Sequence, residues 1–135
     1  TATKEQLMMM LLYGAQRYAA QARAKLQVQH YEASCGLLLR SQNIMLELLG
    51  ALDRGDLGDQ IYDTLAGLYR FVHSRLVQAN VKHEIQALDE AERILAHLSA
   101  TWSLALEKDR AELKPVLAAG AAAAAGEAPP INLEG

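Results

Sequence analysis

The sequence predicts an all-α protein, an antiparallel up-down four-helix bundle. Hydrophobic residues make up 51% of the chain, but only 5% of residues are aromatic, so the apolar side chains are chiefly leucine, alanine, methionine, isoleucine and valine. Unbranched side chains lose little rotamer freedom in a helix, which favours helices over sheets. All three prolines lie in the last fifth of the chain, so none interrupts a helix before Pro115. A length of 135 residues fits one domain with an ordinary core.

The first two helices follow from caps and apolar periodicity. Thr3 and Gln6 have the spacing of a capping box, so a helix is expected from there to about residue 27. Its predicted inward face carries residues three or four apart, namely Leu7, Leu11, Ala15, Tyr18, Ala22 and Leu26. A second helix is expected over residues 31–52. Its predicted stripe is Ser34, Leu38, Ser41, Met45, Leu48 and Leu52.

A loop rich in glycine and aspartate separates the second helix from the third. Residues 53–58 form this loop, and Asp56 is the expected N-cap of a third helix over residues 59–80. The third stripe is Ile61, Leu65, Leu68, Val72, Leu76 and Ala79. A fourth helix over residues 83–107 is predicted to bury Ile85, Leu88, Leu95, Leu98 and Trp102. Similar helices joined by short loops pack as antiparallel neighbours, which gives a bundle over residues 1–108.

The end of the chain gives a weaker signal. Residues 109–117 can form a short fifth helix kinked at Pro115, and residues 118–135 are an alanine- and proline-rich, low-complexity tail that we expect to be flexible. Alanine and glycine bury little apolar area. Removal of residues 120–135 is therefore expected to leave the stability of the bundle nearly unchanged.

Several classes of function are disfavoured by composition. A formal net charge of −3 argues against a nucleic-acid binder. The apolar run at residues 7–13 is too short for membrane insertion, and the first residues lack the apolar region of a signal peptide. The single cysteine, Cys35, cannot form an internal disulfide, which fits a reducing intracellular compartment. We therefore expect an intracellular protein that binds neither nucleic acid nor the membrane interior.

The histidines and the cysteine do not form a recognisable chemical site. Di-iron bundles need a Glu-x-x-His pattern, and none of the four histidines has a glutamate three residues before it. No histidine lies near Cys35 on the same helix face, so the thiol is interpreted as a small buried hydrophobe. The sequence predicts no catalytic residues, no cofactor and no metal, and hence no enzyme.

Apolar residues exceed what one stripe per helix requires. Residues 7–13 are apolar around the whole helix circumference, and further apolar residues flank the other stripes. Facing ridges of such residues accept the anchors of an amphipathic partner helix. The predicted partner-binding residues are Met9, Leu12, Leu37, Ile44, Leu48, Tyr62 and Tyr69. The alternative, that the same residues widen the core, remains open at each position.

Four segments in order resemble the flagellin export chaperone family, FliS. Residues 1–7 (Thr-Ala-Thr-Lys-Glu-Gln-Leu) and 11–15 (Leu-Leu-Tyr-Gly-Ala) resemble its opening, although Lys4 stands where proline is usual and Tyr13-Gly14 lacks an intervening acidic residue. Residues 65–72 and 75–80 resemble its third helix. Matches to its second and fourth helices are Tyr31-Glu32, Gln42, Glu90, Leu95, Leu98 and Thr101-Trp102. The resemblance covers about residues 1–108.

The resemblance implies a cytosolic chaperone for bacterial flagellum biogenesis. Such a protein binds the C-terminal segment of flagellin, prevents premature polymerisation, and delivers the subunit to the flagellar export apparatus, whose components are further partners. The expected state is a monomer or a weak homodimer. Two alternatives stay open, a structural homo-oligomerising bundle without a flagellin client and an enzyme or cofactor-binding bundle.

Overall fold

The computed structural model describes residues 1–128 and contains six helices and no strand in that range. The helices are α1 (Lys4–Gln27), α2 (Tyr31–Ala51), α3 (Arg54–Leu57), α4 (Asp59–Lys82), α5 (Ile85–Leu106) and α6 (Arg110–Glu127). The predicted all-α fold class is confirmed. None of these helices, over the part of the chain that is described, has both the length and the apolar content that a bilayer span needs.

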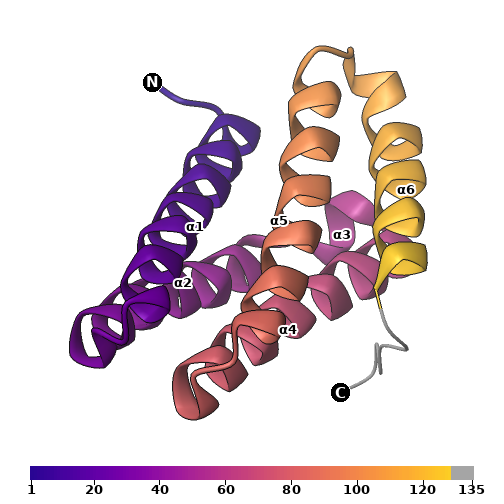
Figure 1. The fold of residues 1–135 in the computed structure, drawn as a ribbon. Coiled ribbons are helices and arrows are strands. Elements are labelled where there is room, and N and C mark those ends of the chain that lie inside the picture. The colour runs from indigo at the N-terminus through magenta and orange to yellow at the C-terminus, as the bar shows by residue number, and fades with distance from the viewer. Residues whose placement is uncertain (129–135) are drawn as a thin grey trace.

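The four long helices of the predicted bundle form a closed ring. α1 packs against α2 and α5, and α4 packs against the same two helices, so the core lies among all four. Short connections reverse the chain between α1 and α2, between α4 and α5, and between α5 and α6 (Figure 1). α6 lies outside the ring against α5 and α4, while the single turn of α3 joins α2 to α4.

Two helix starts show what the local sequence specifies. At α1 the capping box forms as predicted, because the Gln6 amide donates to Thr3 Oγ1 at 3.1 Å and the Thr3 amide donates to Gln6 Oε1 at 2.8 Å. The expectation for residues 53–58 was wrong. Asp53 accepts from the Gly55 amide at 2.9 Å and caps α3, and the N-cap of α4 is Gly58, which has a positive φ of 84°.

The inward stripe of α2 is confirmed, since all six predicted residues are buried. The predicted inward stripes of α4 and α5 are also confirmed, except at Ile61 and Ile85, which are half-buried. Small polar residues in the α2 stripe allow close contact with α1. Ser41 Oγ donates to the Ala15 carbonyl oxygen at 2.9 Å, so this buried hydroxyl is satisfied by the neighbouring helix.

The inward face of α1 differs from the prediction. Leu7 is exposed, and Leu11 and Tyr18 are only partly buried. The predicted burial of Ala15, Ala22 and Leu26 is confirmed. The other buried apolar residues of α1 are Met8, Met9, Leu12 and Ala19, none of which was in the predicted stripe. Because residues 7–13 are apolar on every side, periodicity alone could not decide which of them faces the core. Packing against α2 and α5 decides it.

The end of the chain is more ordered than the sequence suggests. One helix, α6, runs from Arg110 to Glu127 with Pro115 inside it, so the expectation of a short helix that ends at residue 117 is wrong. Residues 118–127 of the predicted tail are helical. Residues 129–135 of that predicted tail lie outside the described residues. Leu117, Ala121 and Ala124 are buried against the bundle. Small side chains are an advantage here, because they let α6 approach α5 and α4 closely.

The closest approach of α6 is at Gly120. A Cβ at this position would lie 2.7 Å from Thr101 Cβ on α5 and closer still to the Oγ1 and Cγ2 atoms of the same residue. No real Cβ contact is this short, so only glycine fits while both helices keep their positions. Gly120 therefore sets the distance between α6 and α5.

Candidate partner-binding groove

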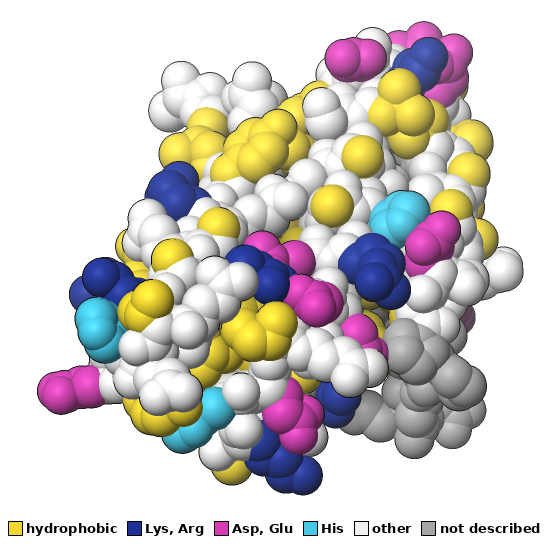
Figure 2. Space-filling view, viewed as in Figure 1, with side chains coloured by type: hydrophobic (Ala, Val, Ile, Leu, Met, Phe, Trp, Pro, Cys, Tyr) yellow, Lys and Arg dark blue, Asp and Glu magenta, His cyan; other side chains and the backbone are white. Residues whose placement is uncertain are grey.

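A surface groove runs between the N-terminal half of α1 and the C-terminal half of α2. We call it the α1–α2 groove. Its lining consists of Lys4, Leu7, Met8, Met10, Leu11, Gly14, Arg17 and Tyr18 from α1, with Ile44, Glu47, Gly50 and Ala51 from α2. Most of these side chains are apolar or small. In Figure 2 hydrophobic side chains gather over the N-terminal part of α1, where the groove begins.

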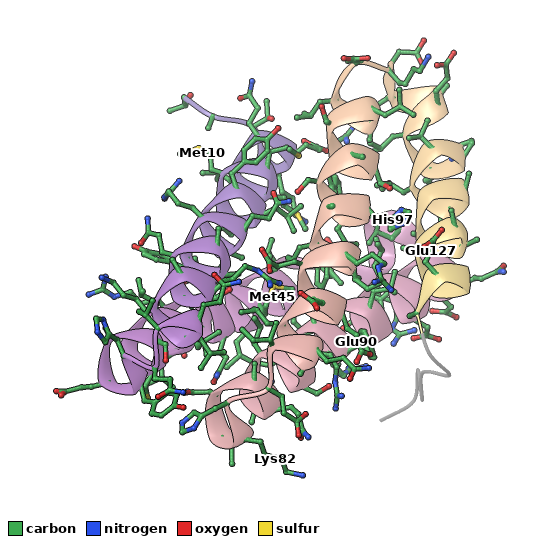
Figure 3. All side chains as sticks on the ribbon, in the orientation of Figure 1. Met10, Met45, Lys82, Glu90, His97 and Glu127 are labelled. Carbon is green, nitrogen blue, oxygen red and sulfur yellow. The ribbon has the colours of Figure 1, made fainter. Side chains whose placement is uncertain are left out.

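The apolar residues at the edge of the groove are accessible to a partner. Leu7 is 49% exposed and Met10 is 63% exposed. Figure 3 labels Met10 on the N-terminal part of α1, where its side chain points away from the other helices. Large apolar side chains gathered on a monomer surface mark interaction sites more often than scattered ones do.

The floor of the groove is shaped by a glycine. Gly14 is buried, and a Cβ there would lie 3.3 Å from Ile44 Cδ1, a contact tighter than most. Because Gly14 has no side chain, Ile44 can extend from α2 across α1. A Cβ at Gly50, in contrast, would meet nothing within 4 Å. The α2 side of the groove is therefore low and open, which suits the close approach of a helix.

Charged residues flank the groove on both sides. Lys4 and Arg17 lie on the α1 side, and Glu47 lies on the α2 side. Tyr18 closes one end of the groove, with the guanidinium of Arg17 5.7 Å and that of Arg40 5.6 Å from its ring centroid. These distances are within the range of cation–π attraction, so the Tyr18 ring is held in place between α1 and α2.

Four of the predicted partner-binding residues belong to the core. Met9, Leu12, Leu48 and Tyr69 are buried, so the prediction that they line an open groove is wrong. Each helix of the ring has two neighbours, and residues beside one stripe face the second neighbour. Tyr69 in particular does not direct its hydroxyl to water, because its oxygen accepts a hydrogen bond from Trp102 Nε1.

The other three predicted residues are partly buried but do not form one site. Ile44 lines the α1–α2 groove. Leu37 lines a shallow hollow at the start of α2 together with Tyr31 and Arg40. The ring of Tyr62 lies under the guanidinium of Arg54, 4.2 Å from its centroid. The structure therefore brings only Ile44 to the groove.

Sequence reasoning missed the α1 side of the groove. Leu7, Met10, Leu11 and Tyr18 line it, and none of them was among the predicted partner-binding residues. The signal was present in the apolar excess of residues 7–13. Because this run is apolar on every side, its spacing alone did not assign Leu7 and Leu11 to the outside.

The arrangement offers apolar surface rather than reactive groups. Within residues 1–128 no cluster of three or more His, Cys, Asp or Glu side chains is arranged to hold a metal ion. Cys35 is half-buried on α2. Burial lowers the pKa of His73 below its ordinary value of 6.5. His73 lies on the side of α4 that faces α2, however, and does not line the α1–α2 groove. A groove of this kind can hold the apolar face of an amphipathic helix.

Comparison with known families decides the identity of the fold. A family model described as flagellar protein FliS matches residues 1–109, which include all four helices of the ring. The chain belongs to the FliS family. The resemblance found from sequence segments is thereby confirmed, and the departures at Lys4 and Gly14 do not remove the chain from the FliS family.

Individual FliS proteins are similar over most of their length. The flagellar secretion chaperone FliS of Bacillus subtilis is 28% identical over 110 residues, which are 82% of this chain and 80% of that protein. The protein of the same name from Salmonella typhimurium is 31% identical over 102 residues, or 76% of each chain. The flagellar secretion chaperone FliSB of Pseudomonas aeruginosa is 28% identical over 101 residues, 75% of this chain and 79% of its own.

FliS is a family of flagellar secretion chaperones, which is not an enzyme class. The α1–α2 groove lies inside the matched residues 1–109, whereas α6 begins at Arg110, directly after them. The groove is therefore part of the matched FliS bundle, and α6 follows directly after the matched residues.

Proposed function

We propose that this protein is a cytosolic export chaperone for flagellin. It binds the C-terminal segment of flagellin, prevents that segment from polymerising prematurely, and aids delivery of the subunit to the flagellar export apparatus. FliS membership supports the chaperone role, and the resemblance supports flagellin as the client. The observation that carries the binding role is the exposure of Leu7 and Met10 beside the α1–α2 groove.

The client segment binds in the groove as an amphipathic helix. Its apolar face covers Leu7, Met10 and Leu11, and its backbone approaches α2 beside Gly50, where no side chain stands. Each large apolar side chain that becomes fully buried contributes about 1.5–3 kcal/mol. Ordering the client segment costs several kcal/mol, so several anchors must be buried together for useful affinity.

The charges beside the groove orient the client helix. Arg17 favours acidic residues on the client flank that faces α1, and Glu47 favours basic residues on the opposite flank. Such pairs at the rim contribute chiefly to specificity and association rate rather than to affinity. The protein acts as a monomer or weak homodimer, with its groove open to the client.

The test compares two charge substitutions on exposed apolar residues. Met10→Asp should fold normally, because Met10 is 63% exposed, and should lose most of its affinity for flagellin. Val81→Asp is the matched control, since Val81 is 72% exposed at the other end of the bundle, near the end of α4, and should bind as the unaltered protein does. Circular dichroism melting establishes folding, and titration calorimetry measures binding to flagellin.

Flagellin lacking its C-terminal segment completes the test. The proposal requires that the truncated flagellin does not bind and that the isolated segment does. Equal binding of Met10→Asp and the unaltered protein would exclude the groove. A stable dimer in light scattering that Met10→Asp dissociates, without any binding of flagellin, would favour the homo-oligomerising bundle instead.

A further inference from the structure

A second cavity opens at one end of the bundle, where α1 begins and α2 ends. We call it the end pocket. Its apolar lining comes from five parts of the chain, namely Met8 of α1, Leu52 after α2, Leu57 of α3, Trp102 of α5 and Leu113 of α6. Its volume is about 190 Å³. Leu113 belongs to α6, so this pocket depends on the helix that follows the matched FliS residues.

The end pocket is continuous with the α1–α2 groove. Lys4, Met8 and Ala51 line both of them. A chain that lies in the groove and continues past the first turn of α1 therefore reaches the pocket beside these shared residues.

The charges around the end pocket balance one another. Three cations and three anions stand there, Lys4, Arg110 and Lys114 against Glu5, Asp53 and Asp56. Arg110 pairs with Glu5 at 2.7 Å, and Lys4 lies 3.7 Å from Asp56. A phosphate or carboxylate would gain little net attraction at this rim and would lose its hydration. The pocket therefore suits an uncharged apolar group.

The volume indicates how large that group is. A dry apolar cavity of roughly 150 Å³ binds benzene, so a cavity of about 190 Å³ has room for one leucine, methionine or phenylalanine side chain. Trp102 at its base is 3% exposed and fixed by its hydrogen bond to Tyr69, so the wall does not need to rearrange. Rigid, preformed pockets of this type hold the side chains that dominate an interface.

We propose that the end pocket receives one large apolar side chain of the client, from residues adjoining the helix that lies in the α1–α2 groove. This inference rests on the proposed flagellin-binding function and adds a second contact to it. The groove holds the face of a helix, and the pocket fixes its position along the groove by a single anchor.

The test fills the pocket from inside. Leu113→Trp replaces a leucine that lines the end pocket with a larger side chain. Ala111→Trp introduces the same side chain at an exposed position of α6 that does not line the pocket. Binding of the fluorescein-labelled C-terminal segment of flagellin is followed by anisotropy. Loss of one central anchor weakens binding by roughly 30-fold, so Leu113→Trp should bind at least tenfold more weakly while Ala111→Trp binds normally.

The outcomes separate the pocket from the groove. Normal binding by Leu113→Trp, together with weak binding by Met10→Asp, overturns the end pocket and leaves the proposed function in place. No binding of the segment by the unaltered protein overturns both. A dimer whose formation shifts the Trp102 emission in the absence of client also overturns the proposal, because the occupant is then a second copy of the chain.

A measurement on the unaltered protein removes any dependence on the folding of Leu113→Trp. Trp102 is the only tryptophan of the chain, so its fluorescence reports on the end pocket. Saturation with the flagellin segment should shift its emission, because a client side chain changes the surroundings of the pocket that Trp102 lines. Replacing the large apolar residues of the segment with alanine one at a time should identify one whose loss abolishes this shift. An emission spectrum that does not respond to any segment that binds overturns the proposal.

Discussion

The indole Nε1 of Trp102 donates a hydrogen bond to the hydroxyl oxygen of Tyr69 at 3.0 Å, inside the core and between α5 and α4. Tyr69 has no exposed surface, and Trp102 has almost none. Each ring therefore satisfies the polar atom of the other where water has no access, and the pair joins two helices of the ring. The predicted burial of Trp102 is confirmed, and its polar partner lies on α4.

Removing the Tyr69 hydroxyl should destabilise the protein although a ring of nearly the same shape remains. Tyr69→Phe leaves the Trp102 N–H buried without an acceptor, which costs about 1–3 kcal/mol. Urea unfolding measures the difference. Tyr13→Phe is the control, because Tyr13 is 52% exposed and should show no change. Equal stability of both variants would mean that the hydrogen bond contributes nothing.

The same residue should make the protein sensitive to alkali. Burial raises the pKa of the Tyr69 hydroxyl above its ordinary value of 10.0, and the hydrogen bond from Trp102 offsets this only in part. Above pH 10 the unfolded chain releases this proton while the folded chain keeps it, so stability falls as pH rises, by at most about 1.4 kcal/mol per pH unit. Below pH 10 the contribution is present in full.

Urea unfolding at pH values from about 9 to about 12, a range that starts below the ordinary pKa of 10.0, should therefore give a steeper loss above pH 10 for the unaltered protein than for Tyr69→Phe. Ionisation of lysines and of exposed tyrosines affects both chains alike and cancels in the comparison. Parallel pH profiles of the two proteins would contradict the assignment.

Two glycines of the same helix should respond to alanine in opposite directions. Gly120→Ala places a Cβ against Thr101 and should cost about 1–3 kcal/mol, because α6 must move away from α5. Gly126→Ala meets nothing within 4 Å and should stabilise the protein by about 0.5–1 kcal/mol through helix propensity. Thermal melting compares them, and stabilisation by both would show that α6 is not held against Thr101.

Shortening α6 should now be costly, contrary to what composition suggests. A chain ending at Ala119 loses the buried methyl groups of Ala121 and Ala124 and uncovers the surface of α5 around Thr101. At roughly 0.8 kcal/mol per buried methyl-sized group, the loss is about 2 kcal/mol, which lowers the melting temperature by several degrees. An unchanged melting temperature would restore the view that residues 120–135 are dispensable for stability.

Most of the ring could be predicted from the sequence because its signals are local. The capping box at Thr3 depends on two residues three apart, and the stripe from Ser34 to Leu52 depends on a fixed spacing of apolar and small residues. Glycine and aspartate at residues 53–58 marked the interruption between the second and third predicted helices. These features act within one or two turns, so one sequence is enough to find them.

The groove and the last helix depend on contacts between distant segments. Residues 7–13 are apolar on all sides, so only packing against α2 and α5 could bury Met8 and Leu12 and leave Leu7 and Met10 outside. Tyr69 and Leu48 became core residues because each faces a second neighbouring helix.

The sequence by itself thus determined the four amphipathic helices of the ring and the resemblance to FliS. Tertiary structure decided which apolar side chains of α1 are available to a partner. Tertiary structure also decided that α6 packs on the bundle. Gly120 and the alanines of α6 have too little apolar area to predict this packing from the sequence. Small side chains stabilise this packing only where α5 and α4 lie close enough to make van der Waals contact with them.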